Sequence, residues 1–352
     1  MNRKPDSHPG SELEVIDRFP ELRVLVVGDI MLDVYEFCRT GDSKPIDSEK
    51  TGKRAYKAQE TIKVLGGAGN VAANLASLDV QTTLVGVTGN DEHYFKIRDL
   101  SDDLGIRHGL IRDERRPTTI KARLYLDDDY LLRRDTECSV RVDGGTSAAL
   151  AKEVLRALPE TDVVILSDYD KGVFTTANTG QIIRDCRLHE IPVVVDFKPG
   201  NRAFFAGADI IAPNAAEAAE LIGGFSMDRL ESDCRRLHAS LGCRNTVVTL
   251  GEQGLCGVGP GGFFHVRGHR VKPVDKVGCG DTVRAGLAIG AALGLPLEES
   301  GELANDAATV IVQKPATSVL SRGELRDFVS GKPTVSPQPA AALAGRGGAS
   351  GG

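Results

Sequence analysis

The sequence predicts an α/β fold in which helices flank a doubly wound, mostly parallel sheet, with a small β-sheet lid beside it. Two observations predict this architecture. Short, nearly continuous apolar runs alternate with segments of helical spacing, as they do where strands are buried on both faces of a parallel sheet. Two further segments instead alternate polar and apolar residues, which is typical of half-exposed strands.

The buried strands are expected in six apolar runs: Leu22–Val27, Thr82–Val87, Asp162–Leu166, Pro192–Val195, Asp209–Ile211 and Thr246–Thr249. Helical spacing fills the intervals, in Gly69–Leu78, Thr146–Leu158, Thr175–His189, Ala215–Ile222, Met227–Leu241, Asp281–Leu293 and Leu297–Gln313. Regular alternation of the two kinds of segment places helices on both faces of the sheet.

The half-exposed segments lie at about 35–65 and 117–137 and carry many Lys and Arg side chains. They predict a small sheet that stands off the main body as a lid, although a solvated edge of the main sheet would show the same alternation of polar and apolar residues. We expect one domain over residues 21–331, preceded by an N-terminal extension (1–20). Residues 332–352 are mostly Pro, Gly, Ala and Ser, a composition that predicts a disordered tail.

Composition excludes several classes of protein. The 352 residues carry 43 Lys+Arg against 49 Asp+Glu, a formal charge of −6, which argues against a nucleic-acid partner. No apolar run approaches the ~18 residues that cross a bilayer, and the first residues lack the apolar stretch of a secretory signal. Seven scattered Cys favour reduced thiols over disulfides or a zinc site. We therefore expect a cytoplasmic protein without membrane insertion.

The segment Asp275–Thr282 (DKVGCGDT) is the strongest local signal in the chain. Its Gly-x-Gly turn precedes a helical run, so the backbone amides of Gly278, Cys279 and Gly280 and the positive end of the helix dipole would form an anion site. Asp281 beside that site predicts a general base that deprotonates a hydroxyl as it attacks a phosphate. A simple helix cap is an equally good interpretation of Asp281 from these residues alone.

This segment resembles the second signature of the ribokinase/PfkB family of carbohydrate kinases, and Gly66–Leu75 (GGAGNVAANL) resembles the first. Val164–Gly172 (VILSDYDKG) is similar to a stretch of the family's D-glycero-β-D-manno-heptose-7-phosphate kinase branch. The other matching segments are Gly28–Asp33, Pro117–Arg123, Leu132–Asp135, Val195–Lys198, Pro213–Glu217, Val248–Gly254 and Ala304–Ala308. The resemblance runs in order from about Val24 to Ser321 and implies a ribokinase-like fold.

The resemblance implies a sugar site in which Asp33, Gly67 and Asn70 contact the substrate. Cations inside the matching segments favour a sugar that already carries a phosphate, although each one alone is also consistent with a solvated surface charge. The further substrate-binding candidates are Lys121, Arg123, Arg133, Asp168, Lys171 and Lys198.

It also implies a nucleotide site for ATP. Asn214 and Glu217 would hold Mg²⁺, largely through water, although an Asn followed three residues later by Glu is by itself typical of a helix start. The other nucleotide-binding candidates are Thr249, Gly251, Gly254 and Asn305. A loop near residue 316 contributes to a monovalent-cation site in some family members, so K⁺ is a further candidate cofactor.

The expected function is ATP-dependent phosphorylation of D-glycero-β-D-manno-heptose 7-phosphate at its anomeric hydroxyl. The 1,7-bisphosphate would serve synthesis of nucleotide-activated heptose for lipopolysaccharide or capsule, and the enzyme would form a homodimer. Thr40–Lys50 departs from the family's lid sequence, and Lys276 and Cys279 depart from its second signature. A PfkB-type kinase of another sugar therefore stays open, as does a catalytically silent sugar-binding regulator. The nucleotidyltransferase His motif is absent, so we expect kinase activity alone.

Overall fold

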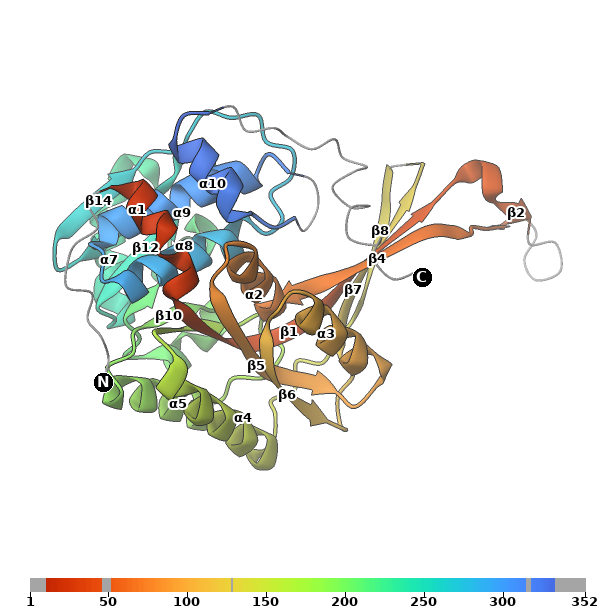
Figure 1. The fold of residues 1–352 in the computed structure, drawn as a ribbon, viewed down its shortest axis with the longest axis horizontal. Coiled ribbons are helices and arrows are strands. Elements are labelled where there is room, and N and C mark those ends of the chain that lie inside the picture. Colours follow the sequence, from red (N-terminus) through yellow and green to blue (C-terminus); the bar gives the residue numbers. More distant parts are fainter. Residues whose placement is uncertain (1–10, 46–51, 128, 315–317, 333–352) are drawn as a thin grey trace.

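The structure is a computed structural model, and it describes residues 11–45, 52–127, 129–314 and 318–332. Its central sheet has the order β14-β13-β12-β11-β10-β9-β1-β5-β6 (Figure 1). Neighbours from β12 to β6 are parallel, whereas β13 and β14 are antiparallel additions at one edge. The strands are β1 (Arg23–Cys38), β5 (Gln81–Gly89), β6 (Arg107–Asp113), β9 (Val163–Ser167), β10 (Val193–Asp196), β11 (Ile210–Ile211), β12 (Asn245–Thr249), β13 (Leu255–Gly259) and β14 (Gly262–Val266). All six expected strands are present.

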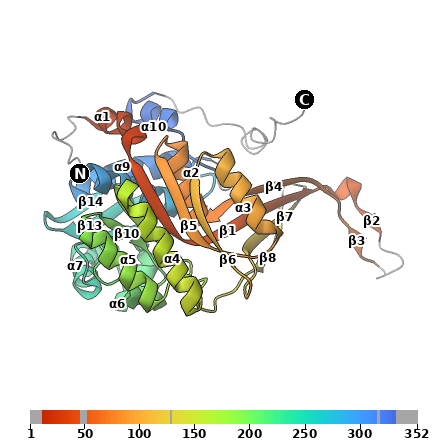
Figure 2. The same cartoon turned by 60° about the horizontal axis from the view of Figure 1, so that its bottom comes forward.

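Helices cover both faces of the sheet, as predicted (Figure 2). Alternation along β1 shows the two faces: Val24 and Val26 belong to one buried cluster, Leu25 and Val27 to the other. The first cluster lies under α2 (Ala68–Ser77), α3 (Glu92–Asp103), α8 (Cys279–Leu293) and α9 (Leu297–Ile311). The second lies under α4 (Gly144–Ala157), α5 (Thr176–Leu188), α6 (Ala215–Ile222) and α7 (Leu230–Leu241).

The small sheet stands off this body, and we call it the lid sheet. It has the order β4-β1-β7-β8, formed by β4 (Ala58–Gly67), the second half of β1, β7 (Thr119–Leu126) and β8 (Asp129–Thr136) (Figure 1). The sequence treated residues 22–27 and the segment from 35 as separate strands, but β1 is continuous through both sheets. Because β1 pairs with β5 and β9 at one end and with β4 and β7 at the other, it joins the lid sheet rigidly to the body.

A short ladder, β2 (Lys44–Pro45) with β3 (Arg54–Ala55), extends the far end of the lid sheet. The altered segment Thr40–Lys50 contributes β2, and its residues 46–50 lie outside the described residues, as does the expected tail from 333 onward.

The first and last helices of the described residues lie side by side on the body. Helix α1 (Glu12–Asp17) packs beside α10 (Arg322–Val329), and Ile16 and Phe19 are completely buried in the first core cluster. The second half of the expected N-terminal extension is thus part of the packed domain, because its apolar side chains fill the space between α10 and the sheet.

Candidate active site

The segment Asp275–Thr282 forms a turn into a helix. Gly278 adopts the left-handed conformation (φ 83°) immediately before α8, and no side chain caps the helix there. The first amides of α8 are therefore left without intrahelical acceptors, which is the condition for an anion cradle at Gly278, Cys279 and Gly280. Burial raises the pKa of the Cys279 thiol to about 11, so the thiol stays neutral, and the Cys279 amide donates to Lys276 O at 3.4 Å.

Asp281 stands at this cradle and is only 7% exposed. Three donors from different elements reach its carboxylate. Asn70 Nδ2 lies 2.6 Å from Oδ2, Tyr169 OH lies 2.6 Å from Oδ1, and Arg284 Nη1 lies 3.3 Å from Oδ1. Burial raises the pKa of Tyr169 well above its usual value, so the phenol keeps the proton it donates. The carboxylate is thus held by side chains rather than used as a helix cap.

A second buried carboxylate, Asp196, faces Asp281 across Arg284. It lies at the end of β10, and its Oδ1 is 2.7 Å from Arg284 Nη2. Burial raises the pKa of Asp196 to about 6, although the guanidinium of Arg284 opposes that shift. Two carboxylates, one from a strand end and one from a helix start, therefore share one arginine.

Asn214 and Glu217 form a reciprocal capping box at the start of α6, as their spacing alone also predicts. Asn214 Oδ1 accepts from the Glu217 amide at 2.9 Å, and Glu217 Oε2 accepts from the Asn214 amide at 3.0 Å. Glu217 Oε1 accepts from Lys198 Nζ at 2.7 Å. These oxygens suit a hard cation such as Mg²⁺, and because each already accepts a protein hydrogen bond, they fit a hydrated ion better than a stripped one.

Asp33 and Arg123 meet where the lid sheet leaves the body. Arg123 Nη1 lies 2.9 Å from Asp33 Oδ1, and its guanidinium packs over the ring of Tyr35. Burial raises the pKa of Asp33, which is 6% exposed. Gly66 makes this arrangement possible, because a Cβ there would lie 2.6 Å from Asp33 Oδ2.

Two of the other expected cations, Lys121 and Lys171, meet at Glu137. Glu137 Oε2 lies 2.8 Å from Lys171 Nζ and 3.9 Å from Lys121 Nζ. Lys121 also lies 3.6 Å from Asp135, which pairs with Arg133 at 2.9 Å. Both lysine side chains are less than a fifth exposed, at 18% and 16%. The lysines therefore converge on a single carboxylate oxygen between the lid sheet and the body.

Asp168 lies behind the site rather than in it. Its side chain is completely buried and accepts from Asn201 Nδ2 at 2.7 Å and from the amides of Asp170 and Lys198. Burial raises its pKa. Asp168 thus shapes the loop that presents Tyr169, and it does not offer a free oxygen to a sugar.

A pocket of about 180 Å³ lies on the other side of the cradle. Gly251 and Asn305 line it, as do Cys279 and Lys276. Gly254 makes the tight turn behind it: its φ is +87°, and a Cβ there would lie 2.1 Å from Val266 O. Thr249 bridges to Asn214 outside the lining. Gly251 and Asn305 therefore line the same pocket, whereas Gly254 and Thr249 are not among its lining residues.

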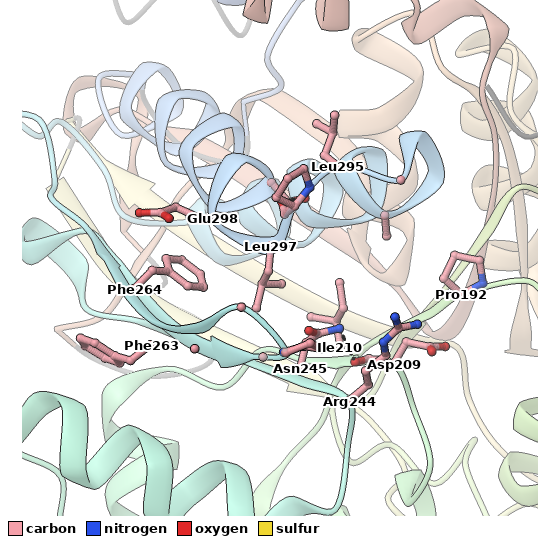
Figure 3. A pocket seen from close by; sticks show the side chains of 18 residues that line it. Pro192, Asp209, Ile210, Arg244, Asn245, Phe263, Phe264, Leu295, Leu297 and Glu298 are labelled. Carbon is pink, nitrogen blue, oxygen red and sulfur yellow. Dashed lines mark hydrogen bonds between the residues drawn. The ribbon is translucent and has the colours of Figure 1, made fainter. Parts of the chain in front are cut away.

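A separate pocket of about 430 Å³ lies at the opposite edge of the sheet (Figure 3). Pro192, Asp209 and Arg244 line it, and each precedes a strand, whereas the carboxylates of the site follow strands. In parallel α/β sheets, ligands bind at the carboxyl ends of the strands. The pocket in Figure 3 is thus distinct from the candidate active site.

Three residues of the site were absent from the sequence-based candidates. They are Tyr169, Asp196 and Arg284. Tyr169 and Asp196 lie within the segments that carry the resemblance, and Arg284 lies one turn beyond the second signature. The sequence does carry a signal for Arg284. It is a charged residue in an otherwise apolar helix, among Val283, Ala285 and Leu287.

The fold and this arrangement are those of a phosphotransferase: a helix start with free amides, a buried carboxylate beside it, and a pocket at the carboxyl edge of a parallel sheet. Residues 21–322 match the pfkB family of carbohydrate kinases. The chain belongs to this family and is a carbohydrate kinase, for which ATP and a divalent metal ion are the expected cofactors.

Relatives and solved structures agree with this assignment. The chain is 36% identical over 315 residues to the D-beta-D-heptose 7-phosphate kinase of Bordetella bronchiseptica, with 88% of this chain and 96% of that protein covered. It is also 36% identical to the bifunctional protein HldE of Nitrobacter winogradskyi, of which it spans 62% (86% of this chain). Phosphofructokinase-2 from Escherichia coli has the same fold, with a TM-score of 0.70, 18% identity, and coverage of 88% and 98%.

Two expectations fall partly outside what is described. The loop considered for K⁺ includes residues 315–317, which are not among the described residues. Of the helices in the described ranges, none combines the length and apolar character that a membrane span requires.

Proposed function

We propose that the chain transfers the γ-phosphoryl group of ATP to the anomeric hydroxyl of a heptose 7-phosphate, with Asp281 as general base. The observation that carries the proposal is the carboxylate of Asp281, held by three donors beside an amide cradle. A carboxylate next to a phosphate site repels its ligand unless a hydroxyl stands between them. The names of the relatives in Bordetella and Nitrobacter support the heptose substrate.

Different residues of the candidate site would act on the sugar hydroxyl, on the phosphoryl group and on the metal ion. The sugar hydroxyl gives its proton to Asp281 Oδ, its oxygen attacks the γ-phosphorus, and ADP leaves with the electrons of the broken P–O bond. The amides of Gly278, Cys279 and Gly280 stabilise the charge on the phosphoryl group in transit. Asn214 and Glu217 would hold Mg²⁺ through water, and the ion supplies neutralising charge to the ATP phosphates.

On the sugar side, Asp33, Gly67 and Asn70 would orient the hydroxyls. Arg123 is already paired with Asp33, and it would hold that carboxylate ready to accept hydrogen bonds. Lys121 and Lys171 would bind the 7-phosphate, because their two ammonium groups converge on one oxygen-sized position between the lid sheet and the body.

A coupled ADP-release assay over a panel of free and phosphorylated hexoses and heptoses tests the proposal. We expect the highest kcat/KM for a heptose 7-phosphate and a loss of at least ~100-fold for the same sugar without its phosphate. A higher kcat/KM for a free sugar would contradict the assignment of the phosphate site. Omitting Mg²⁺ or K⁺ in the same assay tests each ion.

The position of Glu137 makes a separate prediction. Glu137→Gln is expected to lower KM for the phosphorylated sugar about 3- to 10-fold without changing kcat, because the carboxylate no longer competes with the substrate phosphate for Lys121 and Lys171. Steady-state kinetics with phosphorylated and free sugar measure it. Glu153→Gln, which removes an exposed partner of Arg156, is the matched control. An equal change in KM for both sugars would contradict the prediction.

We also propose a homodimer that forms through the lid sheet. The edge strand β8 is exposed along its whole length, and Tyr130, Leu131 and Leu132 are each about half exposed (55%, 49% and 47%). Apolar side chains on an edge strand favour association. Sedimentation equilibrium measures the molecular mass in solution.

A further inference from the structure

Arg284 occupies a position that packing alone does not explain. It lies in α8 between the core residues Val283 and Ala285, and it is only 9% exposed. Its guanidinium folds back over the start of the helix, since a Cβ at Gly280 would lie 2.6 Å from Arg284 Nη1. An apolar side chain would fill this space without the cost of burying a charge.

Not every nitrogen of the Arg284 guanidinium has a hydrogen-bond partner among the described residues. Its Nη2 and Nη1 lie 2.7 Å from Asp196 and 3.3 Å from Asp281, whereas its buried Nε has no hydrogen-bond partner among the described residues. Buried polar atoms without a partner are rare in stable cores and need an explanation. The arrangement is thus poorly suited to stability and calls for a functional reason.

Its two partners come from different elements of the site, Asp281 from α8 and Asp196 from the end of β10. Asp281 accepts from Asn70, which is proposed to contact the sugar, whereas Glu217, which is proposed to hold Mg²⁺, and Lys198 act on the charge of Asp196. We propose that Arg284 is a positioning residue for phosphoryl transfer, which holds Asp281 and Asp196 on either side of the transfer site and neutralises both. This inference rests on the proposed role of Asp281.

Several charged groups surround Asp196 and act on its carboxylate. Arg284 and Asp281 face it from α8, Glu217 from α6, Lys198 from the segment after β10, and Tyr169 lies against the same cluster. Burial and the two neighbouring acids raise the pKa of Asp196 to about 6, and Arg284 counters them more than Lys198 does. Without the guanidinium, Asp196 would bind a proton at a higher pH, because Arg284 lowers its pKa.

The test removes the charge but keeps an unbranched, flexible side chain. Arg284→Met is expected to lower kcat about 100-fold with little change in KM for either substrate, and to move the acid limb of the kcat–pH profile about one pH unit upward. Arg284→Lys is expected to have a kcat about tenfold higher than that of Arg284→Met. Its acid limb in the kcat–pH profile is expected to lie closer to that of the wild type. Arg235→Met, which removes an exposed arginine paired with Glu231, is the matched control.

Two results would overturn the proposal: an Arg284→Met enzyme with wild-type kcat, or one with low kcat and an unmoved acid limb. If Arg284→Met does not fold, the double variant Arg284→Met/Asp196→Asn removes both charges of the ion pair and takes its place. Arg284→Lys by itself still tests the position of the acid limb of the kcat–pH profile. A ¹³C-carboxyl NMR titration of Asp196 in the folded variants needs no turnover. It therefore separates failure of the role of Arg284 from failure of the general-base assignment, which Asp281→Asn tests.

Discussion

Asp281→Asn is expected to lower kcat for sugar phosphorylation by about 10³-fold or more while the affinity for nucleotide and sugar stays near that of the wild type. The amide has the size of the carboxylate and keeps an oxygen for Tyr169 and Arg284, but it cannot accept the proton of the attacking hydroxyl. The ADP-release assay gives kcat, and calorimetric titration with ADP gives the nucleotide affinity.

Asp99→Asn provides the control for this substitution. Asp99 is an exposed aspartate of α3 that pairs with Arg98, far from the cradle in sequence and on the outer face of its helix. It should leave both kcat and affinity unchanged. Turnover of Asp281→Asn within tenfold of wild type would remove Asp281 from the role of base, and loss of ADP binding would show that the cradle itself had been disturbed.

Gly67→Ala is expected to destabilise the folded protein by about 3 kcal/mol or more and to weaken sugar binding. Gly67 precedes α2 with φ 58° and ψ −132°, a conformation that side chains disfavour strongly. A Cβ would also lie 2.4 Å from the carbonyl oxygen of Asp29. Relief of that clash would shift the start of α2, and with it Asn70 and its hydrogen bond to Asp281.

Gly105→Ala is the control for an alanine at positive φ without a steric clash. Gly105 has a similar positive φ of 67°, but a Cβ there meets nothing within 4 Å. The control should therefore cost about 1 kcal/mol, the price of the backbone conformation alone. Urea unfolding of the two variants measures both values. Equal losses would show that the approach of Gly67 to Asp29 is not what demands glycine.

Much of the fold could be predicted from local patterns, because the spacing of apolar residues in a segment indicates which of its faces is buried. The apolar runs predicted the buried strands, and the helical spacing between them predicted the helices that cover both faces. The sequence missed the continuity of β1, since the acidic residues Asp29, Asp33 and Glu36 interrupt its apolar run. It also missed α3, whose mean character is polar and whose buried residues Ile97 and Ser101 are few.

The candidate site was predictable where its chemistry lies in contiguous residues. The segment Asp275–Thr282 predicted a turn, a helix start and a carboxylate beside it, and the structure has all three. Whether Asp281 caps the helix or faces a substrate was undecided from these residues. The answer depends on Asn70 and Tyr169, which reach Asp281 from elements 211 and 112 positions away in the chain.

By itself, then, the sequence determined the class of fold, the family and the cradle, because these depend on short-range patterns of burial and on backbone turns. Only the tertiary structure decided which side chains meet there: Arg284 between two buried carboxylates, and two lysines on the single acid Glu137. The physical reason is that a charge acts on whatever lies within a few ångströms, and such distances are set by packing between elements that no local pattern specifies.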